Sequence, residues 1–222
     1  MAAGLHHRRT PARDCRAAEK VGLWRISLEP ARQPVDRAGA AVNIIETALP
    51  GVLIIEPRVF GDARGFFMET WNAAAFAGAG LDLTFVQDNH SRSQKGVLRG
   101  LHFQNPGPQG KLVRVANGAV FDVAVDLRAA SPTFGQWAGV ELSAANKRMF
   151  WVPEGFAHGF LTLEDDTDFL YKCTAPYAPQ SEHTLAWDDP AVGIEWPSLG
   201  ADPLISEKDA HGLSLAQVQV FV

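Results

Sequence analysis

Residues Gln87 to Gly118 read QDNHSRSQKGVLRGLHFQNPGPQGKLVRVANG, and this stretch decides the fold. It places three basic side chains, Arg99, His102 and Lys111, between short apolar runs. The runs on either side of the Pro/Gly-rich segment predict two β-strands joined by a turn, as in a hairpin. The polar residues of such a hairpin either face solvent or line a cavity, and the spacing alone leaves both interpretations open.

The same pattern continues on both sides of this stretch. Short apolar runs recur between Gly, Pro, Asn and Asp breaks, which is typical of a β-sandwich or jelly roll. Two short helices are expected, one over Asn72–Ala79 with Asn72 as its N-cap and one starting at Ser206. The expected strands are Val52–Ile55, Phe66–Glu69, Val97–Phe103, Leu112–Val115, Val120–Leu127, Trp137–Leu142, Arg148–Val152, Phe156–Leu163 and Phe169–Cys173.

Composition excludes several classes of protein. The 222 residues are 46% hydrophobic with a net charge of −5, which suits one globular domain and gives no sign of a nucleic-acid-binding protein. No apolar run approaches the roughly 20 residues that span a bilayer, so no membrane partner is expected. The two cysteines, Cys15 and Cys173, form no disulfide framework, and a reducing cytoplasm is the expected location.

Residues 1–41 differ from the rest of the chain. They carry eight Lys or Arg against four Asp or Glu, a net charge of +4 that leaves −9 for the remainder. The segment has no strand alternation and no helical stripe, and it lacks the apolar core of a secretory signal. We expect a disordered extension or a wrongly assigned start, with binding of an acidic partner as the alternative. The folded domain should then cover residues 42–222.

Several motifs recur along the chain. RGLHFQ is followed by QGKLVRV, and PRVFGDARGFFMETW lies upstream. VFDVAVDLRAASPTFG, VPEGFAHGF, YKCTAPYAP and ISEKD follow downstream. In this order the motifs resemble the dTDP-4-dehydrorhamnose 3,5-epimerase family, a cofactor-free group of cupin-type sugar-nucleotide epimerases. The likeness covers about Val42 to Leu215. It implies a mainly β fold, a cupin-type double-stranded β-helix or jelly-roll barrel with a few short helices.

A metal site is not expected. Metal-binding cupins use His-x-His followed by a glutamate, whereas this chain has His102-Phe103-Gln104 and no acid before Phe121. Of the cupin metal ligands only His102 and His158 are present, and a stable divalent site takes three or four ligands. We therefore predict no metal and no other cofactor. His158 then either donates a hydrogen bond to substrate or is a satisfied core histidine.

Epimerisation beside a ketone needs a base, a proton donor on the opposite face and a cation or donor at the enolate oxygen. His102 can be the base, since imidazole titrates near neutral pH. The resemblance implies that Asp209 orients His102, that Lys111 stabilises the enolate and that Tyr171 donates the proton. On pattern alone, Lys111 would be a solvated strand residue, Tyr171 a core aromatic and Asp209 part of an ordinary surface sequence.

A nucleotide sugar needs further contacts. Arg64 and Arg99 suit the two phosphates because guanidinium groups bind them in a fork. The resemblance implies a homodimer, in which the segment with Arg64 reaches into the neighbouring subunit's site. Gln87, Asn89 and Glu69 can hydrogen-bond the edge of the pyrimidine. The resemblance implies that Tyr177 stacks on the base and that Glu182 and Lys208 also contact the substrate.

The resemblance implies cofactor-independent 3,5-epimerisation of dTDP-4-dehydro-6-deoxyglucose to dTDP-4-dehydrorhamnose, in dTDP-rhamnose synthesis. The alternatives are a single-site epimerase or keto-sugar isomerase, a non-catalytic binding cupin and a metal-dependent cupin. One feature of the sequence opposes the proposed site. Strict alternation would put Arg99 and His102 on opposite faces of one strand, unless Gly100 forms a bulge that turns one of them.

Overall fold

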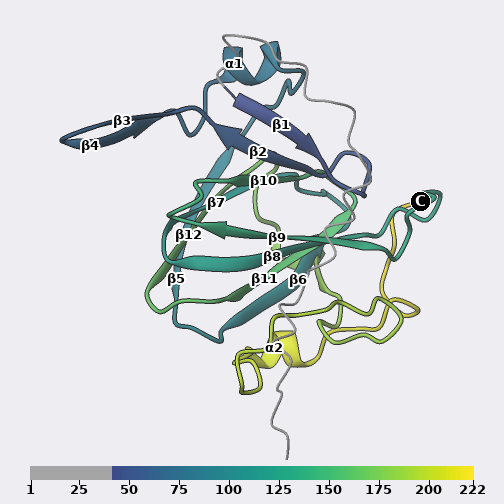
Figure 1. Cartoon of the computed structure of the whole chain (residues 1–222). Coiled ribbons are helices and arrows are strands. Elements are labelled where there is room, and N and C mark those ends of the chain that lie inside the picture. The colour runs from purple at the N-terminus through teal and green to yellow at the C-terminus, as the bar shows by residue number, and fades with distance from the viewer. Residues whose placement is uncertain (1–41) are drawn as a thin grey trace, which may run out of the picture.

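The computed structural model describes residues 42–222, so the expectations for residues 1–41 lie outside the described residues. The described part is rich in strands (Figure 1). Its helices are α1 (Ala73–Gly78), α2 (Glu207–Ala210) and a 3-10 turn over Pro179–Ser181. Its strands are β1 Val42–Glu46, β2 Leu53–Pro57, β3 Val59–Asp62, β4 Gly65–Met68, β5 Gln87–Ser93, β6 Leu98–Gln104, β7 Lys111–Asn117, β8 Ala119–Asp126, β9 Trp137–Ser143, β10 Met149–Val152, β11 Phe156–Thr162, β12 Thr167–Cys173 and β13 Glu182–Thr184.

Two antiparallel sheets make the body of the domain, as the jelly-roll prediction requires. One sheet has the order β1-β2-β10-β7-β12-β5 and the other has the order β13-β6-β11-β8-β9. Their facing side chains form the central core, which includes Val113, Val120, Phe150, Phe160 and Phe169. The core fills part of the space between the sheets, and a polar cavity occupies the rest.

The strand β8 shows why the five-stranded sheet is buried on both faces. Val120 and Ala124 point into the central core, while Val123 and Val125 point to the opposite side. There they meet the C-terminal chain, whose Val218, Phe221 and neighbours cover the outer face of the sheet. A strand buried on both faces is nearly continuously apolar, and VFDVAV has this pattern at every position except Asp122.

The outer face of the six-stranded sheet is covered in part by α1, which places Phe76 against Leu112 and Trp151. The helix begins after Asn72, whose side chain accepts a hydrogen bond from the Ala75 amide at 3.2 Å, as the sequence predicted. The strands β3 and β4 pair only with each other and form an arm that projects from the body (Figure 1).

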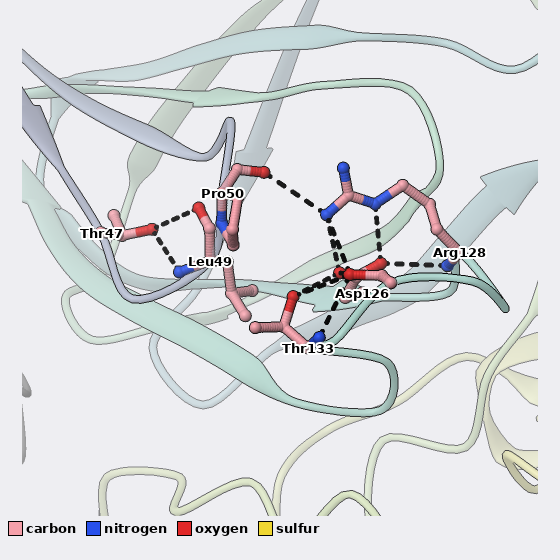
Figure 2. Close-up of polar contacts among 7 residues, drawn as sticks. Thr47, Leu49, Pro50, Asp126, Arg128 and Thr133 are labelled. Atoms are coloured by element: carbon pink, nitrogen blue, oxygen red, sulfur yellow. Dashed lines mark hydrogen bonds and ion pairs between the residues drawn. The ribbon is translucent and has the colours of Figure 1, made fainter.

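A charged network closes the end of β8. Asp126 is fully buried and accepts hydrogen bonds from Arg128 and Thr133 (Figure 2). It also accepts one from Ser131. Arg128 also donates to the carbonyl of Pro50 at 3.4 Å, which ties the β8–β9 turn to the β1–β2 connection. Burial alone would raise the pKa of Asp126, but these hydrogen bonds outweigh it and lower the pKa from 3.8 to about 2.

Every strand expected from the sequence overlaps an observed strand, but the hairpin prediction is wrong. The strands β6 and β7 lie in different sheets, and residues 105–110 cross from one sheet to the other. This Pro-containing connection is longer than the tight turns that usually close a hairpin. The crossing has a functional consequence, since both strands of the central stretch turn polar residues toward the same space between the sheets.

Candidate active site

A cavity of about 620 Å³ opens between the two sheets. Its walls come from β5, β6, β7, β11 and β12 and from residues 204–209. Arg99, His102 and Lys111 all line it, which decides between the two interpretations of the central stretch: its polar residues line a cavity wall. Of the other residues expected from the sequence, the cavity is lined by Gln87, Asn89, His158, Tyr171, Tyr177, Glu182, Lys208 and Asp209.

A β-bulge at Gly100 brings Arg99 and His102 to the same cavity. The pairing of β6 with β11 matches His102 to His158 and Arg99 to Phe160, so β6 has one extra residue between the two pairs. Gly100 has φ of 112°, and a Cβ there would lie 2.7 Å from backbone atoms of His158 and Gly159. Only glycine fits this position, as the bulge prediction required.

His102 is held by a buried carboxylate. Its Nε2 lies 2.5 Å from Oδ1 of Asp209, which is 4% exposed. The Ser206 side chain caps α2 by accepting from the Asp209 amide at 3.2 Å, which fixes the position of the carboxylate. Burial raises the pKa of Asp209, but the hydrogen bond from His102 and further contacts outweigh it and leave the pKa lowered. The Nδ1 atom of His102 has no hydrogen-bond partner within residues 42–222, so it is the nitrogen open to a substrate.

Tyr171 faces the cavity from the other wall. It lies on β12 in the six-stranded sheet, whereas His102 lies on β6 in the five-stranded sheet. Burial raises the pKa of its phenol, so the hydroxyl keeps its proton at neutral pH. No residue in 42–222 accepts that proton in a hydrogen bond. A histidine paired with a carboxylate and a protonated phenol therefore stand on opposite walls of one cavity.

Lys111 brings a cation into the same space. The residue is only 9% exposed, and burial lowers the pKa of its ammonium. Its Nζ lies 3.5 Å from the carbonyl oxygen of His102, and no carboxylate of the described chain forms a salt bridge with it. A buried cation without a bound carboxylate is suited to an anion that forms during a reaction.

A second histidine–carboxylate pair lies beside the first. His158 Nε2 is 2.9 Å from Oδ1 of Asp122, and both residues are buried. His158 has a satisfied ring nitrogen, as one of its two alternatives required, and it also lines the cavity, so donation of a hydrogen bond to substrate stays a prediction. Sequence reasoning missed Asp122, although a single acid within VFDVAV was a signal. Burial raises the pKa of Asp122, and its Oδ2 has no hydrogen-bond partner.

The outer part of the cavity carries the residues expected to bind a nucleotide. Arg99 donates from Nε to Ser93 at 3.1 Å, which directs its guanidinium along the wall. Glu182 accepts from the Tyr177 hydroxyl and from Lys208, both at 2.9 Å. Burial raises the pKa of Glu182, but these two contacts help to lower it overall. Tyr177 is half exposed at the cavity mouth.

Arg64 and Glu69 lie away from the cavity of their own chain. Arg64 is at the tip of the β3–β4 arm, almost fully exposed and paired with Asp62. Glu69 accepts a hydrogen bond from Asn72 at 3.0 Å, next to α1. Neither residue lines the cavity, so their expected role in binding requires a second subunit.

Within residues 42–222, no group of three or more His, Cys, Asp or Glu side chains is arranged to hold a metal ion. No helix in that range is long and apolar enough to cross a membrane.

The fold is a cupin-type barrel, and its cavity contains a histidine–carboxylate pair, a protonated phenol and a buried lysine. A sequence model of the family described as dTDP-4-dehydrorhamnose 3,5-epimerase matches residues 46–217, and the chain belongs to this family. The dTDP-4-dehydrorhamnose 3,5-epimerase of Salmonella typhimurium is 61% identical over 176 residues, which cover 78% of this chain and 96% of the relative.

Solved structures agree in fold. The dTDP-6-deoxy-D-glucose-3,5-epimerase of Legionella pneumophila, in complex with dTDP-4-keto-L-rhamnose, is 54% identical with a TM-score of 0.77. The match covers 80% of this chain and 95% of that one. A 3'-monoepimerase from Streptomyces bikiniensis, in complex with dTDP-quinovose, is 36% identical with a TM-score of 0.72, over 76% of this chain and 86% of that one.

Proposed function

We propose that this protein epimerises dTDP-4-dehydro-6-deoxyglucose at C3 and C5 to give dTDP-4-dehydrorhamnose, in dTDP-rhamnose synthesis and without a cofactor. One observation carries the proposal: His102, held by Asp209, faces Tyr171 across a cavity that also contains the Lys111 ammonium. The relatives that carry the 3,5-epimerase name are also more similar to this chain than the Streptomyces monoepimerase is.

The chemistry follows from proton transfers alone. The hydrogens at C3 and C5 are acidic because C4 is a ketone. Nδ1 of His102 takes the proton, the C–H electrons form the enolate double bond, and negative charge develops on the C4 oxygen beside Lys111. The Tyr171 hydroxyl then gives its proton to the same carbon from the opposite face, and the ketone re-forms. The carbon is inverted with no net oxidation, and solvent returns the two groups to their starting protonation states.

Solvent exchange tests this function. The protein would be incubated with dTDP-4-dehydro-6-deoxyglucose in heavy water, and the sugar read by NMR at each carbon. We expect deuterium at both C3 and C5 of the product. Deuterium at one carbon only would make the protein a single-site epimerase, and no exchange with intact substrate would rule out the reaction.

A homodimer is part of the proposal. The β3–β4 arm exposes Phe60, Phe66 and Phe67, and large exposed aromatic patches mark interaction sites. Arg64 at its tip does not line its own cavity, whereas a second copy related by a twofold axis would place it at the neighbour's cavity. In the same way, Glu69 would approach the neighbour's nucleotide.

Mixing two inactive variants tests this exchange of arms. Arg64→Ala and His102→Asn would be purified separately, then mixed after subunit exchange. A mixed dimer contains one intact site, made of His102 from one chain and Arg64 from the other, so about a quarter of wild-type activity should return. Mixtures of Arg64→Ala with itself serve as the control. Failure to recover activity in verified mixed dimers would show that the arm does not serve the partner's site.

We also propose a cytoplasmic location. The one cysteine within residues 42–222, Cys173, is a buried free thiol, and free thiols persist in a reducing compartment.

A further inference from the structure

We propose that three glutamine side chains, Gln87, Gln104 and Gln109, form a clasp that positions the Tyr177 loop and so sets affinity for the nucleotide. All three line the cavity beside Tyr177. They act as positioning residues, because each bonds the loop backbone. The inference rests on the proposed function in one respect: Tyr177 is taken to stack on the base of the nucleotide.

The clasp holds the carbonyl side of the loop with two amide donors. Gln109 donates from Nε2 to the carbonyl oxygen of Ala175 at 2.7 Å. Gln104 donates from Nε2 to the next carbonyl, that of Pro176, at 3.3 Å. The direction of the chain before Tyr177 is therefore fixed by side chains from β6 and the β6–β7 connection.

The amide side of the loop is held by two glutamine oxygens. Oε1 of Gln87 accepts from the Tyr177 amide at 2.7 Å. Oε1 of Gln104 accepts from the Ala178 amide at 2.8 Å. Four consecutive residues thus each give one backbone group to a glutamine side chain.

The backbone of the loop lies outside the sheet hydrogen-bond ladders of the described chain. The neighbouring backbone bonds are Thr174 to Gly110 on one side and Ser181 to Ala178 on the other. Within residues 42–222, residues 175–177 make no backbone-to-backbone hydrogen bond. Amide side chains therefore supply the hydrogen-bond partners that a neighbouring strand supplies elsewhere in the fold.

Gln104 is the centre of the clasp. It is 3% exposed and also donates to the carbonyl of Gly107 at 2.8 Å, so it joins the crossing connection to the Tyr177 loop. It lies on β6 two residues after His102, which ties the nucleotide end of the cavity to the strand that carries the base. A glutamine is required because the site needs a donor for two carbonyls and an acceptor for one amide.

The clasp also changes the role expected for Gln87. Its oxygen accepts from Tyr177, and its nitrogen donates to Oδ1 of Asn89 at 3.0 Å. Both ends of the side chain are thus used within the protein, and Gln87 contributes to base recognition by placing Tyr177.

The test uses Gln104→Glu, which keeps the size of the side chain but faces two carbonyl oxygens with a carboxylate. Gln109→Met is a second variant that removes one donor at a less buried position, and Gln136→Glu is the control for charge at an exposed glutamine. Binding of dTDP would be measured by calorimetry and the reaction by steady-state kinetics. We expect Gln104→Glu to weaken dTDP binding and to raise KM by about 10-fold or more, with kcat within about threefold of wild type. Gln109→Met should change KM in the same direction but less, and Gln136→Glu should match the wild type.

A double-mutant cycle shows whether the clasp acts through Tyr177. If it does, the single variant Tyr177→Ala weakens dTDP binding. Adding Gln104→Glu or Gln109→Met to Tyr177→Ala then weakens binding little further. Fully additive losses, or a fall in kcat at unchanged KM, would overturn the proposal. Wild-type affinity for dTDP in Tyr177→Ala would also overturn it. The proposed reaction is tested separately, by the deuterium exchange.

Discussion

Replacing Asp126 by asparagine should destabilise the domain in a way that depends on pH. The carboxylate is fully buried and accepts hydrogen bonds from Arg128 through its backbone amide, Nε and Nη2, and from Thr133 (Figure 2). It also accepts one from Ser131. Asparagine would place an amide nitrogen among these donors and leave Arg128 without its counter-charge. The Arg128 side chain is 35% exposed, so water solvates part of the charge left behind, and the loss should cost about 2 kcal/mol of unfolding free energy at pH 7.

The pH dependence has a definite sign. The pKa of Asp126 is about 2 in the folded protein against 3.8 ordinarily, so the carboxylate contributes up to about 2 kcal/mol of stability above pH 4. A lowered pKa means that this stability is lost as the pH falls through about 2. By pH 3, about 1 kcal/mol should already be lost. The asparagine side chain of the variant does not titrate, so the difference between the two proteins should shrink by that amount.

Urea unfolding at fixed protein concentration, at pH 7 and at pH 3, measures this difference. Asp82→Asn is the control, because Asp82 is exposed and should change stability by less than about 0.5 kcal/mol. An equal difference between wild type and Asp126→Asn at both pH values would refute the reasoning. A loss below about 1 kcal/mol at pH 7 would show that the network contributes little.

Four further predictions concern the site, the cofactor and the N-terminal segment. Lys111→Ala should lower kcat by roughly 10²–10³ with little change in dTDP binding, since the cation acts on the enolate, and weaker binding at normal kcat would contradict this. Because burial lowers the pKa of Lys111 from 10.5, wild-type kcat should fall on the alkaline side below pH 10.5, and the residual rate of Lys111→Ala should lack that limb. Exhaustive chelation should leave activity unchanged, and activity lost on chelation and restored by one metal would refute the cofactor-free reaction. Deleting residues 1–41 should leave folding and activity unchanged, and an insoluble or monomeric product would show that the segment is structural.

Much of the barrel could be predicted because its strands carry apolar residues at strand spacing. The strand β5 was missed because QDNHSRS has no apolar residue. Gln87, Asn89 and Ser91 of this strand face the polar cavity, and the residues between them face outward. The side chains on both faces of the strand are therefore polar. A strand that lines a wet cavity has no hydrophobic signature to detect.

The family resemblance, and not the residue pattern alone, selected Lys111, Tyr171 and Asp209, which the structure places at the cavity. Features that depend on three-dimensional geometry were predicted less well. The Gly100 bulge followed from the conflict between alternation and the shared role of Arg99 and His102. The separation of β6 and β7 into two sheets could not be read from a Pro/Gly segment that fits a hairpin equally well. Asp122 was missed because nothing in the sequence shows that His158 on β11 pairs with Asp122 on the neighbouring strand β8.

The most direct test of the central claim separates the base from the proton donor. Substrate would be incubated in heavy water with His102→Asn and with Tyr171→Phe, and exchange at C3 and C5 followed by NMR. His102 acts first, so His102→Asn should abolish exchange at both carbons. Tyr171 acts after the enolate forms, so Tyr171→Phe should still allow exchange from the base side while inversion slows by roughly 10²–10⁴. Exchange that persists in His102→Asn and vanishes in Tyr171→Phe would contradict the account.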